Sequence, residues 1–338
     1  MRHFVIVAIL VIVLAVMTYL GLDAVGLMPV QASAQAVIVD RLWNLEVMTI
    51  SFLFALIMVP LFYSLIVFRR RKGETGDGEH VTGNTSLEIA WTAIPLLIVV
   101  VFAYLGAYNL GETRRVDPQA MEIKVTAQQF AFSFEYPDYG FVSPDLYLPV
   151  NKQVLLKMTS RDVIHSFWVP EFRIKQDILP GRTTEYRITP TLLSSPERQY
   201  KVRCAELCGA SHAYMLANLQ VVSQADFDAW VTDRQAEAQA AANTPEGRGQ
   251  TLVVQNGCLG CHTIDGSPKT GPTWLDLLGR QEKMADGTIV TVDDAYVRES
   301  ILNPQAKIVR SFEGVLMPAY ELSDDQIADI IAYMKTLK

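Results

Sequence analysis

The chain has 338 residues, which is enough for two modest domains and additional elements. Half of the residues are hydrophobic and 19% are charged, an apolar composition for a soluble protein, and the net charge of −7 argues against nucleic acid as a partner. Four cysteines could form two disulfides in an exported protein, but they stand in two clusters that also contain histidine at ligand spacing.

The N-terminus, residues 1–36, contains an apolar run at 4–22 that follows Arg2. It predicts either a retained helix or a signal peptide, because "QASAQA" at 31–36 offers small-residue cleavage sites. The run is longer than the hydrophobic part of a usual signal peptide and lies some distance from those sites. We therefore favour a retained helix.

A transmembrane helical hairpin is predicted over 40–112, with spans at about 44–68 and 89–111. Each span exceeds the roughly 20 apolar residues that cross a bilayer core of ~30 Å. Two buried core helices of a soluble protein are the alternative. The loop at 69–80 opens with "RRRK", so the positive-inside rule places it in the cytoplasm and everything after about Gly111 outside a cell membrane of bacterial type.

Residues 113–223 contain short runs that alternate between apolar and polar side chains, separated by turn residues. This pattern predicts an all-β sandwich or barrel. The Ala- and Gln-rich stretch 224–245 predicts a helix and a linker. From 246 to 338 the pattern indicates helices to the end of the chain.

The first cluster, "CAELCGASHAYM", contains Cys204, Cys208, His212 and Met215. A thioether is a poor zinc ligand, whereas thiolate, imidazole and methionine together favour copper. A second histidine is available as His165 in "DVIHSFWVP". Because two thiolates exceed the need of one blue copper, two bridged coppers are the economical interpretation. Such a centre leaves no open position for substrate and therefore serves electron transfer.

The second cluster, "CLGCH", has the Cys-x-x-Cys-His spacing of c-type haem attachment. Cys258 and Cys261 would bind the porphyrin covalently, and His262 would be the first axial ligand of the iron. A thioredoxin-like dithiol is the alternative, but it needs a βαβ pattern that this region lacks.

Methionine is a common second axial ligand, and Met317 is the predicted one. Pro318 after it indicates an extended or turn geometry, which suits a ligand held on a loop. Met284 and Met334 are the other candidates. Met334 lies on the apolar stripe of a helix predicted to begin near Ser323, and this favours a place in the core.

The order of "DVIHSFWVP" and "CAELCGASHAYM" after a two-helix hairpin resembles subunit II of haem–copper cytochrome c oxidases, over about 40–230. The resemblance implies a cupredoxin fold with a binuclear copper A centre. It implies side-chain ligands at His165, Cys204, Cys208, His212 and Met215. It also implies that Glu206 binds copper through its backbone carbonyl and a magnesium ion, shared with subunit I, through its side chain.

Two further positions follow from the resemblance. Glu88, in "LEIAWTAIP", would lie at the cytoplasmic mouth of a proton pathway, while a charge that only marks the water interface is the alternative. Phe130, in "QQFAFSFEYP", stands where the family usually has a tryptophan that receives electrons from external cytochrome c. The usual docking patch is therefore in doubt.

Residues 246–338 resemble a small all-α class I cytochrome c, with Pro272 as a haem-contacting proline. The chain as a whole thus resembles a cytochrome-c-fused oxidase subunit II. This implies a multi-domain membrane protein that passes electrons from haem c to copper A and on to subunit I, where a proton-pumping enzyme reduces dioxygen to water. The donor could be cytochrome c, another small redox protein or a quinol-oxidising complex.

Three other functions are alternatives to this interpretation. A subunit of a copper A nitric oxide reductase would share all metal ligands. A lone membrane-tethered electron shuttle or copper-delivery protein would need neither Glu88 nor Glu206. Quinol-oxidising relatives lack the copper cysteines and are excluded by Cys204 and Cys208.

Overall fold

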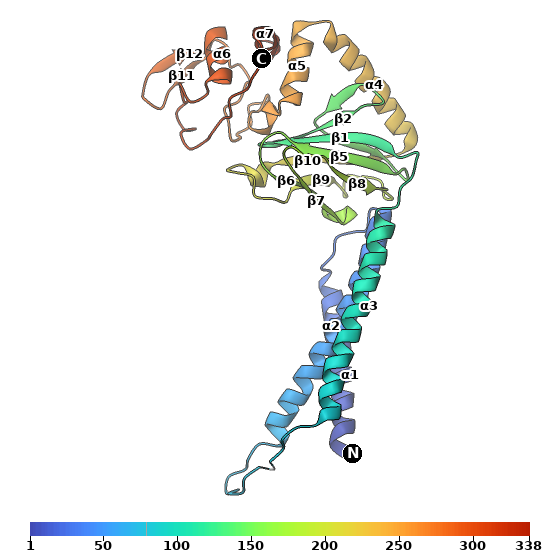
Figure 1. The fold of residues 1–338 in the computed structure, drawn as a ribbon. Coiled ribbons are helices and arrows are strands. Elements are labelled where there is room, and N and C mark those ends of the chain that lie inside the picture. The colour runs from blue at the N-terminus through green and yellow to red at the C-terminus, as the bar shows by residue number, and fades with distance from the viewer. Residues whose placement is uncertain (79) are drawn as a thin grey trace. The chain divides into compact units, whose positions relative to one another are not determined.

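The computed structural model describes residues 1–78 and 80–338, so the predicted cytoplasmic loop is described except for residue 79. The N-terminal part contains three long helices (Figure 1), which are α1 (Arg2–Val25), α2 (Ala34–Val67) and α3 (Thr85–Thr113). Each is long and apolar enough to cross a membrane, and few of their side chains are buried. Apolar side chains exposed in this way require lipid or partner helices around them. The predicted spans are therefore present, although α2 begins well before residue 44.

The described residues divide into two compact units. The first consists of Met1–Gln31 and Gln35–Arg115, and the second of Ala32–Ala34 and Val116–Lys338. Within the second unit, Ser33 pairs with Pro190 of the β-rich part.

The β-rich part is a sandwich of two five-stranded sheets, as the alternating pattern predicted. One sheet has the order β3-β2-β1-β5-β8 and contains β1 (Met121–Gln128), β2 (Ala131–Tyr136), β3 (Phe141–Ser143), β5 (Val154–Ser160) and β8 (Thr184–Ile188). The other has the order β4-β10-β9-β6-β7 and contains β4 (Leu146–Pro149), β6 (His165–Val169), β7 (Ile174–Ile178), β9 (Tyr200–Cys204) and β10 (Leu216–Val222). Alternate residues of each strand fill the space between the sheets, for example Val154, Leu156 and Met158 of β5.

Helix α4 (Gln224–Ala242) follows the sandwich and packs on it through aromatic side chains. Trp230 stacks on Tyr147 with ring centroids 4.4 Å apart. Ser223 caps the helix by accepting a hydrogen bond from the backbone N–H of Asp226. The predicted linker is short, because the next helix already begins at Pro245.

The C-terminal part has its own hydrophobic core, formed mainly by α5 (Pro245–Gln255), α6 (Asp294–Leu302) and α7 (Asp324–Met334). Helix α7 begins at Ser323 with a complete capping box, which confirms its predicted start. The predicted helical class of this part is confirmed, but the expectation of helices alone missed one small element. Two short strands, β11 (Gln281–Lys283) and β12 (Ile289–Thr291), form an antiparallel hairpin.

Candidate functional site

The first cysteine cluster lies at one end of the second sheet. Strand β6 begins at His165, β9 ends at Cys204, and β10 starts directly after Met215. The pairing of β6 with β9 sets His165 beside the loop that contains Cys208. His212 opens the short 3-10 helix η2 (His212–Tyr214). The structure therefore brings together all five predicted side chains.

The sulfur atoms form the centre of this cluster. The Sγ atoms of Cys204 and Cys208 lie 3.8 Å apart, and both residues are free thiols. Nδ1 of His165 lies 3.9 Å from the Cys204 sulfur, and Nδ1 of His212 lies 3.6 Å from the Cys208 sulfur. The Met215 thioether is 3.8 Å from Cys208 Sγ. The disulfide reading of Cys204 and Cys208 is thus wrong, and each thiol has its own imidazole.

The carbonyl oxygen of Glu206 lies 3.3 Å from the Cys204 sulfur, while its side chain is exposed. The cluster is otherwise well shielded, since His165 and Met215 are fully buried. Two thiolates, two imidazoles, a thioether and a carbonyl form a soft set that fits copper better than zinc.

Asp162 orients the buried histidine, a role that sequence reasoning missed. Its carboxylate lies 2.7 Å from Nε2 of His165 and also accepts hydrogen bonds from the backbone N–H groups of Gln129 and Val163. With Nε2 engaged in this way, Nδ1 faces the sulfur atoms. The signal was present in the sequence as an acidic residue three positions before the histidine.

Electrostatics in the cluster favour a thiolate. Burial lowers the pKa of His165, but hydrogen bonds with Asp162 and Cys204 outweigh it and raise the pKa to about 9. The hydrogen bond with Cys208 lowers the pKa of Cys204 to about 3, and the same hydrogen bond, together with burial and the charge on Cys204, raises the pKa of Cys208. The first proton of the pair is therefore lost easily, as a metal-binding thiol pair requires.

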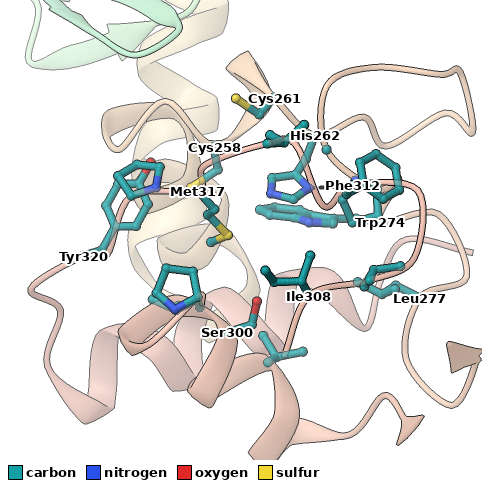
Figure 2. A pocket seen from close by; sticks show the side chains of 18 of the residues that line it. Cys258, Cys261, His262, Trp274, Leu277, Ser300, Ile308, Phe312, Met317 and Tyr320 are labelled. Carbon is teal, nitrogen blue, oxygen red and sulfur yellow. Dashed lines mark hydrogen bonds between the residues drawn. The ribbon is translucent and has the colours of Figure 1, made fainter. Parts of the chain in front are cut away.

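The second cluster lines a mostly apolar pocket in the C-terminal part (Figure 2). Cys258 is the first residue of the short 3-10 helix η3 (Cys258–Gly260) after α5, and Cys261 follows its end; both line the pocket with His262. Figure 2 shows the Cys258 side chain turned toward the pocket and the Cys261 sulfur turned out of it. Attachment of a porphyrin to Cys261 therefore requires rotation about its Cα–Cβ bond.

His262 is held as a neutral ligand would be. Its Nδ1 lies 2.7 Å from the carbonyl oxygen of Pro272, and its ring stacks on Trp274 with centroids 5.0 Å apart. Burial lowers the pKa of His262, which keeps the imidazole neutral. Nδ1 then donates to Pro272 and Nε2 is left with a lone pair for a metal. Pro272 and Trp274 thus position the imidazole, and the role of Trp274 was not predicted.

Among the candidate methionines, Met317 lines this pocket and lies near His262 and Cys258 in Figure 2. Met334 also lines it, but it belongs to the hydrophobic core of α7, as predicted. Met284 is buried elsewhere, and its sulfur lies 4.0 Å from the Tyr296 hydroxyl. Of the three candidates, Met317 is therefore the one that lines the pocket without belonging to the hydrophobic core.

Glu88 lies in the first turn of α3, away from both clusters in the sequence and in a different compact unit. Its carboxylate is 3.3 Å from the backbone N–H of Asn84, whose own side chain caps the helix. This contact gives Glu88 a structural role at the helix N-terminus.

Three membrane-spanning helices, a β-sandwich with a thiolate–imidazole cluster and a helical domain with a Cys-x-x-Cys-His pocket define a membrane-anchored electron-transfer protein. Comparisons with known proteins make the class specific. Residues 21–107 match "Cytochrome C oxidase subunit II, transmembrane domain", residues 141–222 match its "periplasmic domain", and residues 247–338 match "Cytochrome c".

Individual relatives agree with these matches. The chain is 32% identical to cytochrome c oxidase subunit 2 of Alkalihalophilus pseudofirmus, over 85% of this chain and 83% of that protein. It is 35% identical to the Thermostichus vulcanus subunit, over 64% of this chain and 80% of that protein, and 35% identical to the Synechocystis subunit, over 65% and 76%.

The chain therefore belongs to the cytochrome c oxidase subunit II family, in the form with a fused cytochrome c domain. It is a membrane subunit of a haem–copper oxidase, with a periplasmic domain, and acts in electron transfer. Its domains imply copper A and haem c as cofactors, and both clusters fit these groups.

Proposed function

We propose that this subunit receives electrons at the covalent haem c, passes them to a binuclear copper A centre, and delivers them to subunit I of a proton-pumping oxidase, where dioxygen is reduced to water. The observation that carries this proposal is the 3.8 Å separation of the Cys204 and Cys208 sulfurs, each with one imidazole nitrogen beside it. When bound, such a copper pair supplies fast one-electron exchange without an open position for substrate.

The protein's own groups define how that pair would be held. His165 and His212, through Nδ1, and the thiolates of Cys204 and Cys208 would hold the copper pair. The Glu206 carbonyl lies on the Cys204 side and the Met215 thioether on the Cys208 side, so each metal would gain one weak ligand. Burial of His165 and Met215 excludes water, which limits reorganisation when the charge changes.

The haem would be held by thioether bonds to Cys258 and Cys261 and by axial bonds from His262 and Met317. Pro272 keeps the His262 proton on Nδ1, so that Nε2 is the atom offered to the iron. A thioether opposite the imidazole favours a relatively high reduction potential, which suits acceptance of electrons from a soluble or membrane-bound donor. The donor would be cytochrome c, another small redox protein or a quinol-oxidising complex.

Two acidic residues complete the proposal. The exposed Glu206 side chain would bind a magnesium ion shared with subunit I. Glu88, at the start of α3, would stand at the cytoplasmic mouth of a proton pathway in addition to its contact with Asn84.

A metal and haem count on the purified full-length chain tests the assignment. We expect two coppers and one covalent haem per chain. Cys208→Ser should reduce the copper content and leave the haem, whereas Cys258→Ser should weaken haem attachment and leave the copper. One copper per wild-type chain, or zinc in its place, would refute the binuclear assignment.

A further inference from the structure

Inside the second compact unit, the loops that carry the two candidate redox sites lie on either side of the contact between the sandwich and the cytochrome domain. On one side is the haem-attachment turn, residues 256–261. On the other is the β1–β2 turn, residues 128–131, which joins two strands of the first sheet.

Two glycines make the approach of these turns possible. A Cβ atom on Gly260 would stand 2.8 Å from the carbonyl oxygen of Phe130, so the backbones of the two turns are in direct contact. Gly257 adopts a φ of 62°, and a Cβ there would stand 2.2 Å from Nε2 of Gln128. At Gly260 a side chain would displace the backbone of the β1–β2 turn, whereas at Gly257 the positive φ favours glycine and a larger residue would displace the Gln128 side chain.

Polar and apolar contacts surround the glycines. The Ser211 hydroxyl, in the copper-ligand loop, lies 2.7 Å from the Thr270 hydroxyl of the haem pocket. Arg161 donates a hydrogen bond of 3.3 Å to the Asn256 side chain. The Cβ atom of Ala131 would lie 3.1 Å from a Cβ built at either glycine.

The β1–β2 turn also touches the copper-ligand loop. Gln129 donates a hydrogen bond of 2.5 Å from its side chain to the carbonyl of Cys208. The Phe130 ring reaches Gly209, where a Cβ would stand 3.0 Å from Cζ. Phe130 therefore contacts the neighbour of one copper ligand through its ring and the neighbour of one haem-attachment cysteine through its backbone.

We propose that the β1–β2 turn is the docking site of the haem-attachment turn. Phe130 is then a positioning residue that fixes the separation of haem and copper within one chain. The proposal rests on the function proposed above. The step that it supports moves one electron from the reduced haem iron to the oxidised copper pair, with no bond broken and no proton transferred. The Phe130 side chain is 6% exposed and its carbonyl contacts the haem-attachment turn, so an external donor would deliver its electron to the haem instead of at Phe130.

Gly260→Ala tests the contact between the two turns. Gly314→Ala is the matched control, since nothing lies within 4 Å of a Cβ at Gly314. The first measurement is hydrogen–deuterium exchange of the metal-loaded full-length chain in detergent. We expect residues 128–131 and 256–262 to exchange roughly tenfold to a hundredfold faster in Gly260→Ala, equivalent to about 1.4–2.7 kcal/mol and within the range that overpacking costs. The control should match wild type.

The second measurement is the rate at which a flash-reduced haem is reoxidised by the copper centre. We expect the fast phase to be lost or slowed in Gly260→Ala and retained in Gly314→Ala. If Gly260→Ala prevents haem attachment, Ala131→Leu replaces it. Ala131 lies outside the haem motif, and its Cβ is 3.1 Å from a Cβ built at Gly257 or Gly260.

Unchanged hydrogen exchange in Gly260→Ala, or in Ala131→Leu where that variant replaces it, would overturn the docking proposal. Faster exchange with an unchanged rate of electron transfer from haem to copper would overturn it too. A wild-type chain whose loaded haem never reduces its copper would instead refute the function proposed above. The two failures are therefore distinguishable in one experiment.

Discussion

Removal of the Asp162 carboxylate should weaken copper binding although Asp162 is not a ligand. Its oxygen lies 2.7 Å from Nε2 of His165, a histidine with no exposed surface. A hydrogen bond to a charged group contributes about 1.5–3 kcal/mol, and 1.36 kcal/mol is a factor of ten in affinity. Asp162→Ala should therefore lower copper affinity by roughly ten- to a hundredfold, in line with such groups around other metals.

The assay is copper retention by the purified chain against a graded series of a copper chelator, followed by the visible spectrum. Asp162→Asn should give an intermediate loss. Its amide oxygen can still accept from Nε2, but its NH2 group would face the Gln129 N–H where a carboxylate oxygen now accepts. Asp138→Ala, at an exposed turn of the same domain, is the control. Equal copper retention by Asp162→Ala and wild type would refute the idea that Asp162 orients His165.

Three further predictions concern the cytochrome domain and the exposed glutamate. Met317→Ala should leave the haem attached but change the absorption spectrum of its iron, while Met284→Ala, a buried truncation, should leave the spectrum and destabilise the domain by about 2–5 kcal/mol in denaturant unfolding; the reverse would move the axial role to Met284. Ser323→Ala removes the capping box and should cost about 0.5–2 kcal/mol in the same unfolding assay, with no spectral change. Glu206→Gln should keep the copper spectrum, because the carbonyl remains, but lower magnesium content in the assembled oxidase; retained magnesium would contradict the side-chain assignment.

The copper cluster was predictable because most of its ligands lie within one loop, from Cys204 to Met215. His165 was harder, since it comes from another strand, and only the resemblance made its pairing partner specific. The structure supplies the physical reason, which is that Phe167 of β6 pairs with Cys204 of β9. Asp162 escaped prediction because its orientation depends on a turn whose side chains hydrogen-bond to one another, and such a turn leaves no periodic signal.

The hairpin β11–β12 was missed for a different reason. Strands of three residues are too short to express an alternating pattern, and the apolar residues around them fit a helix equally well. The better signal was the dipeptide Asp286–Gly287, where Gly287 adopts a φ of 89°. Aspartate followed by glycine between two short runs is a strong local indication of a hairpin.

Phe130 shows where sequence reasoning stops and long-range contact begins. The sequence revealed a departure from the family's tryptophan and, separately, a haem motif far along the chain. Nothing in either segment indicates that Gly260 meets the carbonyl of Phe130. The docking proposal connects the absence of the tryptophan and the presence of the haem motif through one physical cause. A cytochrome domain that is part of the same chain and docks on this face removes the need for an aromatic patch that recognises a diffusing partner. The contact then requires close backbone packing, and a phenylalanine beside two glycines is sufficient for that packing.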